Sequence, residues 1–142
     1  MLYVLDTNVV SELRKAGDGR ADKGVTDWLA GEDAPRFFLS VVTLLELEIG
    51  VGRVERRDPA RGARLREWID GRVLPEFSGR VLPIDIPVAL RCAKLHVPDP
   101  RAERDALIAA TALVHGMTVV TRNVGDFRET GVPFLNPWLE RP

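Results

Sequence analysis

The sequence is poor in the residues that build disulfides and zinc sites. Cys92 is its single cysteine, and it has two histidines in 142 residues. One cysteine excludes an internal disulfide and is typical of a reducing cytoplasm, where we expect the protein to act. These three residues are also too few for a structural zinc site of the Cys/His kind. No apolar run approaches the roughly 18–20 residues that span a bilayer, and Asp6 interrupts the first run too early for a secretory signal.

A surplus of positive charge is also missing. The 20 Lys and Arg residues are balanced by 21 Asp and Glu residues, which gives a formal net charge of −1. A generally basic nucleic-acid binder usually carries a positive surplus, so this class is disfavoured. The length of 142 residues, with 45% hydrophobic and 29% charged residues, indicates one globular domain over residues 1–142.

What the sequence does have is an alternation of strand-like and helix-like segments. Ser40 can cap the helix at 41–57, Asp99 and Pro100 form a helix-start signal, and Gly116 can end that helix. Such alternation predicts an α/β fold, with a central, mostly parallel, twisted sheet of about five strands flanked by helices. We expect strands at residues 2–5, 37–39, 80–84, 117–121 and 132–135, and helices at 9–15, 25–30, 41–57, 60–76, from Pro87 to 95, and from about 100 to 115.

Functional residues of parallel sheets gather at the carboxyl ends of the strands, and Asp6 follows the first expected strand. Asp6 could simply cap the next helix, but Thr7 and Asn8 could cap it equally well and leave this carboxylate available. Glu46 lies in the apolar stretch 41–47, where an unpaired carboxylate is costly to bury unless it binds a partner or a metal.

Two readings compete for Glu46. Thr43 and Glu46 match a capping box, but Ser40 already fits the cap, so we favour a functional Glu46. Glu48, two residues on, points elsewhere on the helix, and we expect it to be solvated.

Asp105 precedes nine residues of which only Thr111 is polar. A helix that is apolar on all sides is buried on all sides. The acid at its head would therefore lie at the edge of the core, where the helix amides favour negative charge. The alternative is a surface acid beside Glu103 and Arg104.

Two further oxygen ligands, Asn123 and Asp126, follow the fourth expected strand, although both could be turn residues near a glycine. Clustered carboxylates repel one another and raise their pKa values, and a hard divalent cation relieves that repulsion. Oxygen ligands without His or Cys favour Mg²⁺ or Mn²⁺ over zinc. Such ions activate a water and stabilise charge at a phosphodiester, so the pattern favours metal-dependent phosphodiester hydrolysis.

Four segments in order resemble the motifs of the PIN domain, in particular VapC-type toxin nucleases of the FitB-like branch. The resemblance covers nearly the whole chain, and four motifs at suitable spacing are specific although each alone is weak. It implies a PIN-like fold and a Mg²⁺-dependent endoribonuclease, the toxin of a type II toxin–antitoxin pair, with Mn²⁺ as a plausible substitute. The matching residues are 5–12, 40–47 with Gly50, 105–112, and 121–127, with a closing similarity at 136–138.

The resemblance also implies roles for individual residues. Asp6 and Asp105 would bind the metal directly, and Glu46 would be a ligand or a base that orients the water. The family's fourth acid falls on Asn123 or on Asp126, so either could complete the metal site, and the amide at 123 weakens a second metal position. The implied catalytic acids are Asp6, Glu46, Asp105 and Asp126, and the implied supporting residues are Thr7, Asn8 and Thr43.

RNA contact requires positive charge near these acids, and Arg122 is the best single candidate for a phosphate contact. Residues 53–72 hold seven arginines against four acids. Such a surface could position RNA without reading its sequence. We favour the alternative of a solvated helix face with ion pairs, and an antitoxin could lie there as well.

The resemblance implies a VapB-like antitoxin whose tail enters the site, an RNA substrate, and a homodimer or a hetero-oligomer with the antitoxin, with no membrane partner. One alternative function is a non-catalytic PIN-fold module that binds a partner protein. Another is an Asp-nucleophile phosphatase, but that chemistry usually places a second Asp two residues after the first, where this chain has Asn8.

Overall fold

Five short strands, all parallel, form a single sheet in the order β3-β2-β1-β4-β5 in the computed structural model, which describes residues 1–139. In the central strand, Val4 lies in register with Phe38 on one side and with Val119 on the other. This arrangement confirms the expected α/β fold. The strands are β1 (Tyr3–Leu5), β2 (Phe37–Ser40), β3 (Val81–Leu82), β4 (Thr118–Val120) and β5 (Phe134–Leu135).

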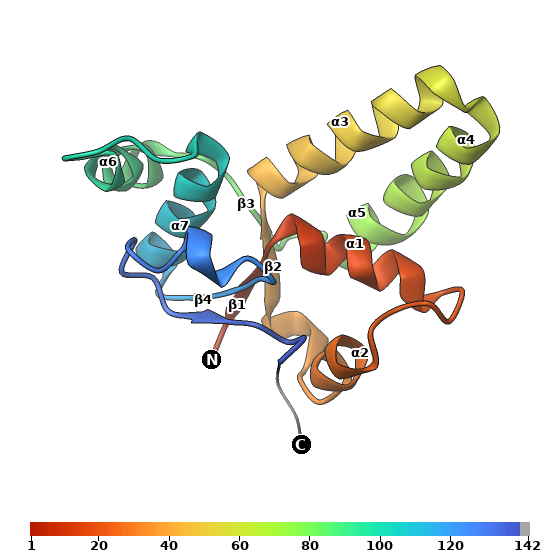
Figure 1. Cartoon of the computed structure of the whole chain (residues 1–142), viewed down its shortest axis with the longest axis horizontal. Coiled ribbons are helices and arrows are strands. Elements are labelled where there is room, and N and C mark those ends of the chain that lie inside the picture. The colour runs from red at the N-terminus through yellow and green to blue at the C-terminus, as the bar shows by residue number, and fades with distance from the viewer. Residues whose placement is uncertain (140–142) are drawn as a thin grey trace.

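Helices cover both faces of this sheet, because alternate residues of each strand point to opposite sides. Tyr3 and Leu5 belong to one hydrophobic core, and Val4 between them belongs to the other. Figure 1 shows α6 and α7 on one side and α1, α2 and α3 on the other. These helices are α1 (Thr7–Ala16), α2 (Lys23–Ala30), α3 (Val41–Arg57), α6 (Ile86–Leu95) and α7 (Glu103–His115), and two short 3-10 turns, η1 (Ala34–Arg36) and η3 (Val124–Asp126), complete the connections.

A helical hairpin projects from the sheet, formed by α3 and the segment that follows it (Figure 1). The single helix expected over 60–76 is divided into α4 (Pro59–Trp68), a π-helical turn η2 (Ile69–Val73) and α5 (Leu74–Glu76). The amide of Leu74 donates to the carbonyl of Ile69, a π-helical bond five residues back. Pro75 has no amide to donate and would clash with the carbonyl of an α-helical turn, which accounts for the interruption.

The start of α7 differs from the sequence-based expectation. The helix begins at Glu103 after Ala102, whose side chain makes no capping bond, so the prediction of a start at Asp99 and Pro100 is wrong. The preceding loop has its own bonds, because the amide of Arg101 donates to Nδ1 of His96. The predicted end is confirmed, since Gly116 closes α7 with a left-handed backbone at φ 66°.

Within residues 1–139, no helix is both long and apolar enough to cross a bilayer.

Candidate active site

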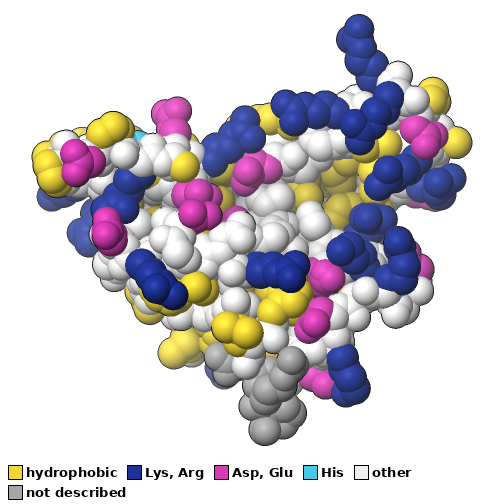
Figure 2. Space-filling model, viewed as in Figure 1, with side chains coloured by type: hydrophobic (Ala, Val, Ile, Leu, Met, Phe, Trp, Pro, Cys, Tyr) yellow, Lys and Arg dark blue, Asp and Glu magenta, His cyan; other side chains and the backbone are white. Residues whose placement is uncertain are grey.

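The candidate site lies at the carboxyl ends of β1 and β4, where α1, α3 and α7 begin (Figure 1). On the face shown in Figure 2, carboxylate side chains gather between the start of α3 and the start of α7. Parallel strands all end at the same edge, so α1 and α3 begin there directly after β1 and β2, and α7, which runs back to the start of β4, begins at the same edge.

Asp6 is the most enclosed of the candidate acids, with only 5% of its surface exposed. Its Oδ1 accepts from the amide of Thr7 at 2.8 Å, which makes it the N-cap of α1. Its Oδ2 accepts from the hydroxyl of Thr121 at 2.8 Å and from the side-chain amide of Asn8 at 3.2 Å. Burial raises the pKa of Asp6 despite these bonds, and the charge of Glu46 raises it further. Asp6 therefore caps the helix and also belongs to the acidic cluster.

The hydroxyl of Thr121 is the shared hydrogen-bond partner of Asp6, Asn8 and Asn123, a role that the sequence analysis missed. The residue is fully buried, and besides donating to Asp6 it accepts from Nδ2 of Asn8 at 3.3 Å and from the amide of Asn123 at 3.0 Å. The Oδ1 of Asn8 accepts from the amide of Arg122 at 3.1 Å. Asn8 and Thr121 thus tie the end of β1 to the end of β4. A hydroxyl at the end of an apolar strand was the one signal of this role in the sequence.

Glu46 faces the same region from the second turn of α3. Its Oε1 accepts from the hydroxyl of Thr7 at 2.7 Å, and its Oε2 lies 3.8 Å from Nη1 of Arg104. The hydroxyl of Thr7 also lies 3.4 Å from that of Thr43, which is fully buried. Ser40 caps α3 by accepting from the amide of Val42, so Thr43 and Glu46 do not form a capping box.

Asp105 lies in the first turn of α7, close enough to the other three candidate acids for their charges to act on it. Its pKa is raised to about 6, first because of burial and then because of the charges of Asp6, Asp126 and Glu46. The structure therefore places all four sequence-predicted acids within one electrostatic field. Their arrangement can bind a cation or a proton, since either relieves the repulsion.

The rim of the site is formed by residues 122–126. Asn123 and Asp126 are exposed at the two ends of η3, and the charge of Asp126 is the one that reaches Asp105. The guanidinium of Arg122 is exposed and lies 5.2 Å from the centre of the Trp138 ring. The backbone of Arg122 directly follows Thr121, which donates to Asp6, whereas its guanidinium lies over Trp138.

The residues present fit a hard divalent cation in their chemistry, because every candidate donor is an oxygen and neighbouring carboxylates raise the pKa of Asp6 and of Asp105. Within residues 1–139, however, no three His, Cys, Asp or Glu side chains already form a group that could hold a metal ion. The fit therefore rests on the donor set and on its excess of negative charge, which the contact of Glu46 with Arg104 offsets only in part.

Sequence comparisons place the whole chain among known proteins. The model of the PIN domain matches residues 3–133. The chain is 35% identical to VapC ribonuclease Y4jK of Sinorhizobium fredii over 144 residues, covering 96% of this chain and 98% of the relative. It is also 38% identical to Toxin FitB of Neisseria gonorrhoeae over 144 residues, covering 96% of this chain and 99% of the relative.

Solved structures agree with the sequence relatives. FitAcB from Neisseria gonorrhoeae matches with a TM-score of 0.88 and 34% identity, over 98% of this chain and 100% of that chain. A toxin–antitoxin complex from Klebsiella pneumoniae matches with a TM-score of 0.63 and 26% identity, over 95% of this chain and 97% of that chain. The chain therefore belongs to the PIN domain family, with VapC ribonucleases and FitB toxins among its homologues.

Proposed function

We propose that this protein is the ribonuclease toxin of a toxin–antitoxin pair and hydrolyses RNA phosphodiester bonds with the help of Mg²⁺. The observation that carries the proposal is the pKa of Asp105, raised to about 6 by burial and by three neighbouring carboxylates at one sheet edge. A fold maintains such repulsion most readily where a cation compensates it in the working state. The names of the VapC ribonuclease and FitB toxin relatives support the same activity.

The proposed roles follow the contacts. Asp6 and Asp105 would hold the ion, and Glu46 would be a further ligand or would orient the attacking water. When bound, Mg²⁺ would lower the pKa of a water and stabilise charge on the phosphodiester, and Mn²⁺ could replace it. Asp126 or Asn123 would complete the rim.

The remaining residues position these groups or the substrate. Thr7 fixes one oxygen of Glu46, while Asn8 and Thr121 fix one oxygen of Asp6. Arg122, which is exposed and directly follows Thr121 in the chain, would contact a phosphate of the RNA.

We also propose a cytoplasmic VapB-like antitoxin as the partner, because a solved neighbour of this fold is a toxin–antitoxin complex. Co-expression with the cognate antitoxin should relieve growth arrest caused by the protein alone. Growth arrest that persists with every co-expressed antitoxin candidate encoded beside this protein would contradict this partner.

Purified protein tests the activity directly. It should cleave RNA with Mg²⁺ and lose this activity when a chelator is added. Asp6→Asn and Asp105→Asn should each abolish cleavage, while their circular dichroism spectra stay unchanged and their thermal unfolding stays cooperative. Cleavage retained in either variant would overturn the site assignment. A wild type that cleaves no class of RNA at any metal condition would favour the alternative, a PIN-fold module that only binds a partner protein.

A further inference from the structure

The face of α3 that carries Glu46 continues away from the site with a distinct composition. At about 100° per residue, positions 46, 50, 53 and 57 fall within about 60° of one another on the helix. Beyond Glu46 these positions hold Gly50, Arg53 and Arg57, all three exposed. The row spans about 16 Å from Glu46 to Arg57, at a rise of 1.5 Å per residue. We call these three residues the arginine face.

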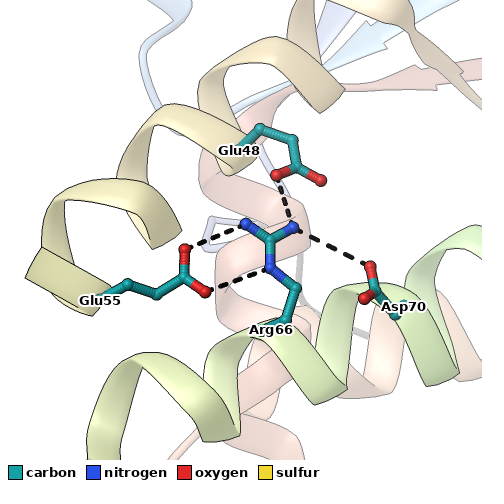
Figure 3. A network of polar contacts seen from close by, with 4 residues as sticks. All are labelled: Glu48, Glu55, Arg66 and Asp70. Carbon is teal, nitrogen blue, oxygen red and sulfur yellow. Dashed lines mark hydrogen bonds and ion pairs between the residues drawn. The ribbon is translucent and has the colours of Figure 1, made fainter. Parts of the chain in front are cut away.

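The two other acids of α3, Glu48 and Glu55, lie on roughly the opposite side of the helix, toward α4. Arg66 of α4 collects both: its Nη1 donates to Glu48 at 2.6 Å, and its Nη2 and Nε donate to the two oxygens of Glu55 at 3.2 and 3.4 Å. Asp70 adds a weaker contact at 3.9 Å. Figure 3 shows this one guanidinium surrounded by three carboxylates between the helices of the hairpin.

This network keeps the ion pairs of the hairpin on the side of α3 that faces α4. Glu48 and Glu55 form their ion pairs with Arg66, on the side toward α4, and not with Arg53 or Arg57. In residues 1–139 the ion pairs of the 53–72 segment all converge on Arg66, and none involves the arginine face. The favoured expectation of a solvated helix face with ion pairs matches Arg66, whereas Arg53 and Arg57 are exposed and form no ion pair with any residue of 1–139. Glu48 is half-exposed but ion-paired, which also corrects the expectation that it is merely solvated.

The positive charge along α3 is visible on the molecular surface. Figure 2 shows Lys and Arg side chains following α3 toward the end of the hairpin, with carboxylates near its start. Positive charge thus leads along α3 to the acidic site, where Glu46 itself contacts Arg104.

We propose that the arginine face is a phosphate track, which seats the backbone of single-stranded RNA and leads it toward Glu46. The inference rests on the proposed ribonuclease function and deepens it. Arg guanidinium groups bind phosphate oxygens in a bidentate geometry. The face is open at Gly50, since a Cβ built there would meet nothing within 4 Å.

An RNA backbone fits this face better than an acidic protein does. The positions of the face hold no apolar side chain, whereas the centre of a protein interface is apolar and depleted of charge. Phosphate contacts require only cations at spacing along a strand, and they release condensed counterions on binding. The continuity with Glu46 on one helix face also gives the bound strand a direction, toward the acids.

The test is the salt dependence of RNA binding. Arg53→Gln and Arg57→Gln are combined in an Asp105→Asn background, so that the RNA stays intact, and binding of a short fluorescein-labelled single-stranded RNA is followed by anisotropy over a KCl series. Losing two phosphate contacts should reduce the slope of log K against log[KCl] by about 1.4, at about 0.7 per contact. With Asp105 restored, the double variant should raise KM for RNA with kcat nearly unchanged.

Arg91→Gln with Lys94→Gln is the matched control, because it removes the same charge from two exposed positions on α6. The control should keep the wild-type slope. An unchanged slope in the α3 variant, or an equal loss in the control, would overturn the track while leaving ribonuclease activity in the wild type untouched. A variant that keeps its RNA slope but binds the antitoxin more weakly would overturn it in favour of a protein contact. A different result, the absence of RNA cleavage by the wild type, would contradict the proposed ribonuclease function.

Discussion

The hydroxyl of Thr7 donates to Oε1 of Glu46 at 2.7 Å, and this bond joins the start of α1 to α3 across 39 residues of sequence. It leaves Oε2 of Glu46 to face Arg104 and the site. We predict that Thr7→Val reduces RNA cleavage about tenfold or more, because hydrogen bonds to charged groups contribute about 1.5–3 kcal/mol. Thr7→Ser should restore most of the activity, since it keeps the hydroxyl.

Metal-dependent cleavage rates and thermal melting of both variants check this prediction. The effect should fall on kcat with melting nearly unchanged in Thr7→Ser. Equal activity of Thr7→Val and wild type would show that Glu46 needs no such orientation.

The raised pKa of Asp105 predicts how stability depends on pH without metal. Its pKa is about 6 in the folded chain against an ordinary value of 3.8, so the neutral form favours the folded state. That contribution is fully present below about pH 4 and is lost as pH rises through about 6. Asp105→Asn cannot ionise, so above about pH 6 it should be more stable than wild type by about 1 kcal/mol, a value reduced for solvent screening at this half-exposed site.

Urea unfolding of both proteins in a chelator, at several pH values, measures this difference. The two free energies of unfolding should converge toward about pH 4. A difference that stays constant with pH would show that neither burial nor the other acids raise the pKa of Asp105 in the folded protein.

Sequence reasoning singled out the acids of the candidate site from local signals. Ser40 and the helix it caps were predicted correctly, since a capping hydroxyl and a continuous helical run lie within a few residues of each other. Asp6 and Asp105 were found from their position after a strand and before an apolar helix, features that depend only on neighbouring residues.

The parts that the sequence did not reveal depend on contacts distant in the chain. Thr121 and Asp6 are 115 residues apart, and nothing in the local sequence of either shows the bond. The π-helical turn before Pro75 and the three partners of Arg66 arise from packing within the hairpin. The failed helix start at Asp99 reflects the bond from the Arg101 amide to His96, which holds that loop outside the helix.

Metal binding should stabilise the folded protein. Millimolar Mg²⁺ is expected to raise Tm by several degrees, because a ligand at about 100 times its Kd stabilises by about 2.7 kcal/mol when it binds only the folded state. The rise should be larger at about pH 7 than at about pH 5, since protons compete for Asp105 as the pH falls below its pKa of about 6.

Differential scanning fluorimetry with Mg²⁺, Mn²⁺ and chelator measures this shift, and Asp105→Asn serves as the control that should show little of it. Melting curves of wild type that do not respond to either metal would contradict a cation site, as would an equal shift in the variant.

Gly62 allows α3 and α4 of the helical hairpin to approach closely, so substituting it should have a measurable effect on stability. A Cβ at Gly62 would lie 2.4 Å from Cα and 2.7 Å from the backbone nitrogen of Glu55, so backbone rather than a flexible side chain would have to move. Gly62→Ala should therefore destabilise the protein by about 1–3 kcal/mol, the usual cost of overpacking. It should also disturb the contact of Glu55 with Arg66.

Gly52→Ala is the matched control, since a Cβ at that helical position of α3 meets nothing within 4 Å. It should raise stability by about 0.5–1 kcal/mol, because alanine is the better helix former. Urea unfolding of both variants gives opposite signs if the hairpin is packed as described. A Gly62→Ala protein as stable as Gly52→Ala would mean that the two helices separate easily, and that the contacts of Arg66 with Glu48 and Glu55 do not depend on close packing of the hairpin.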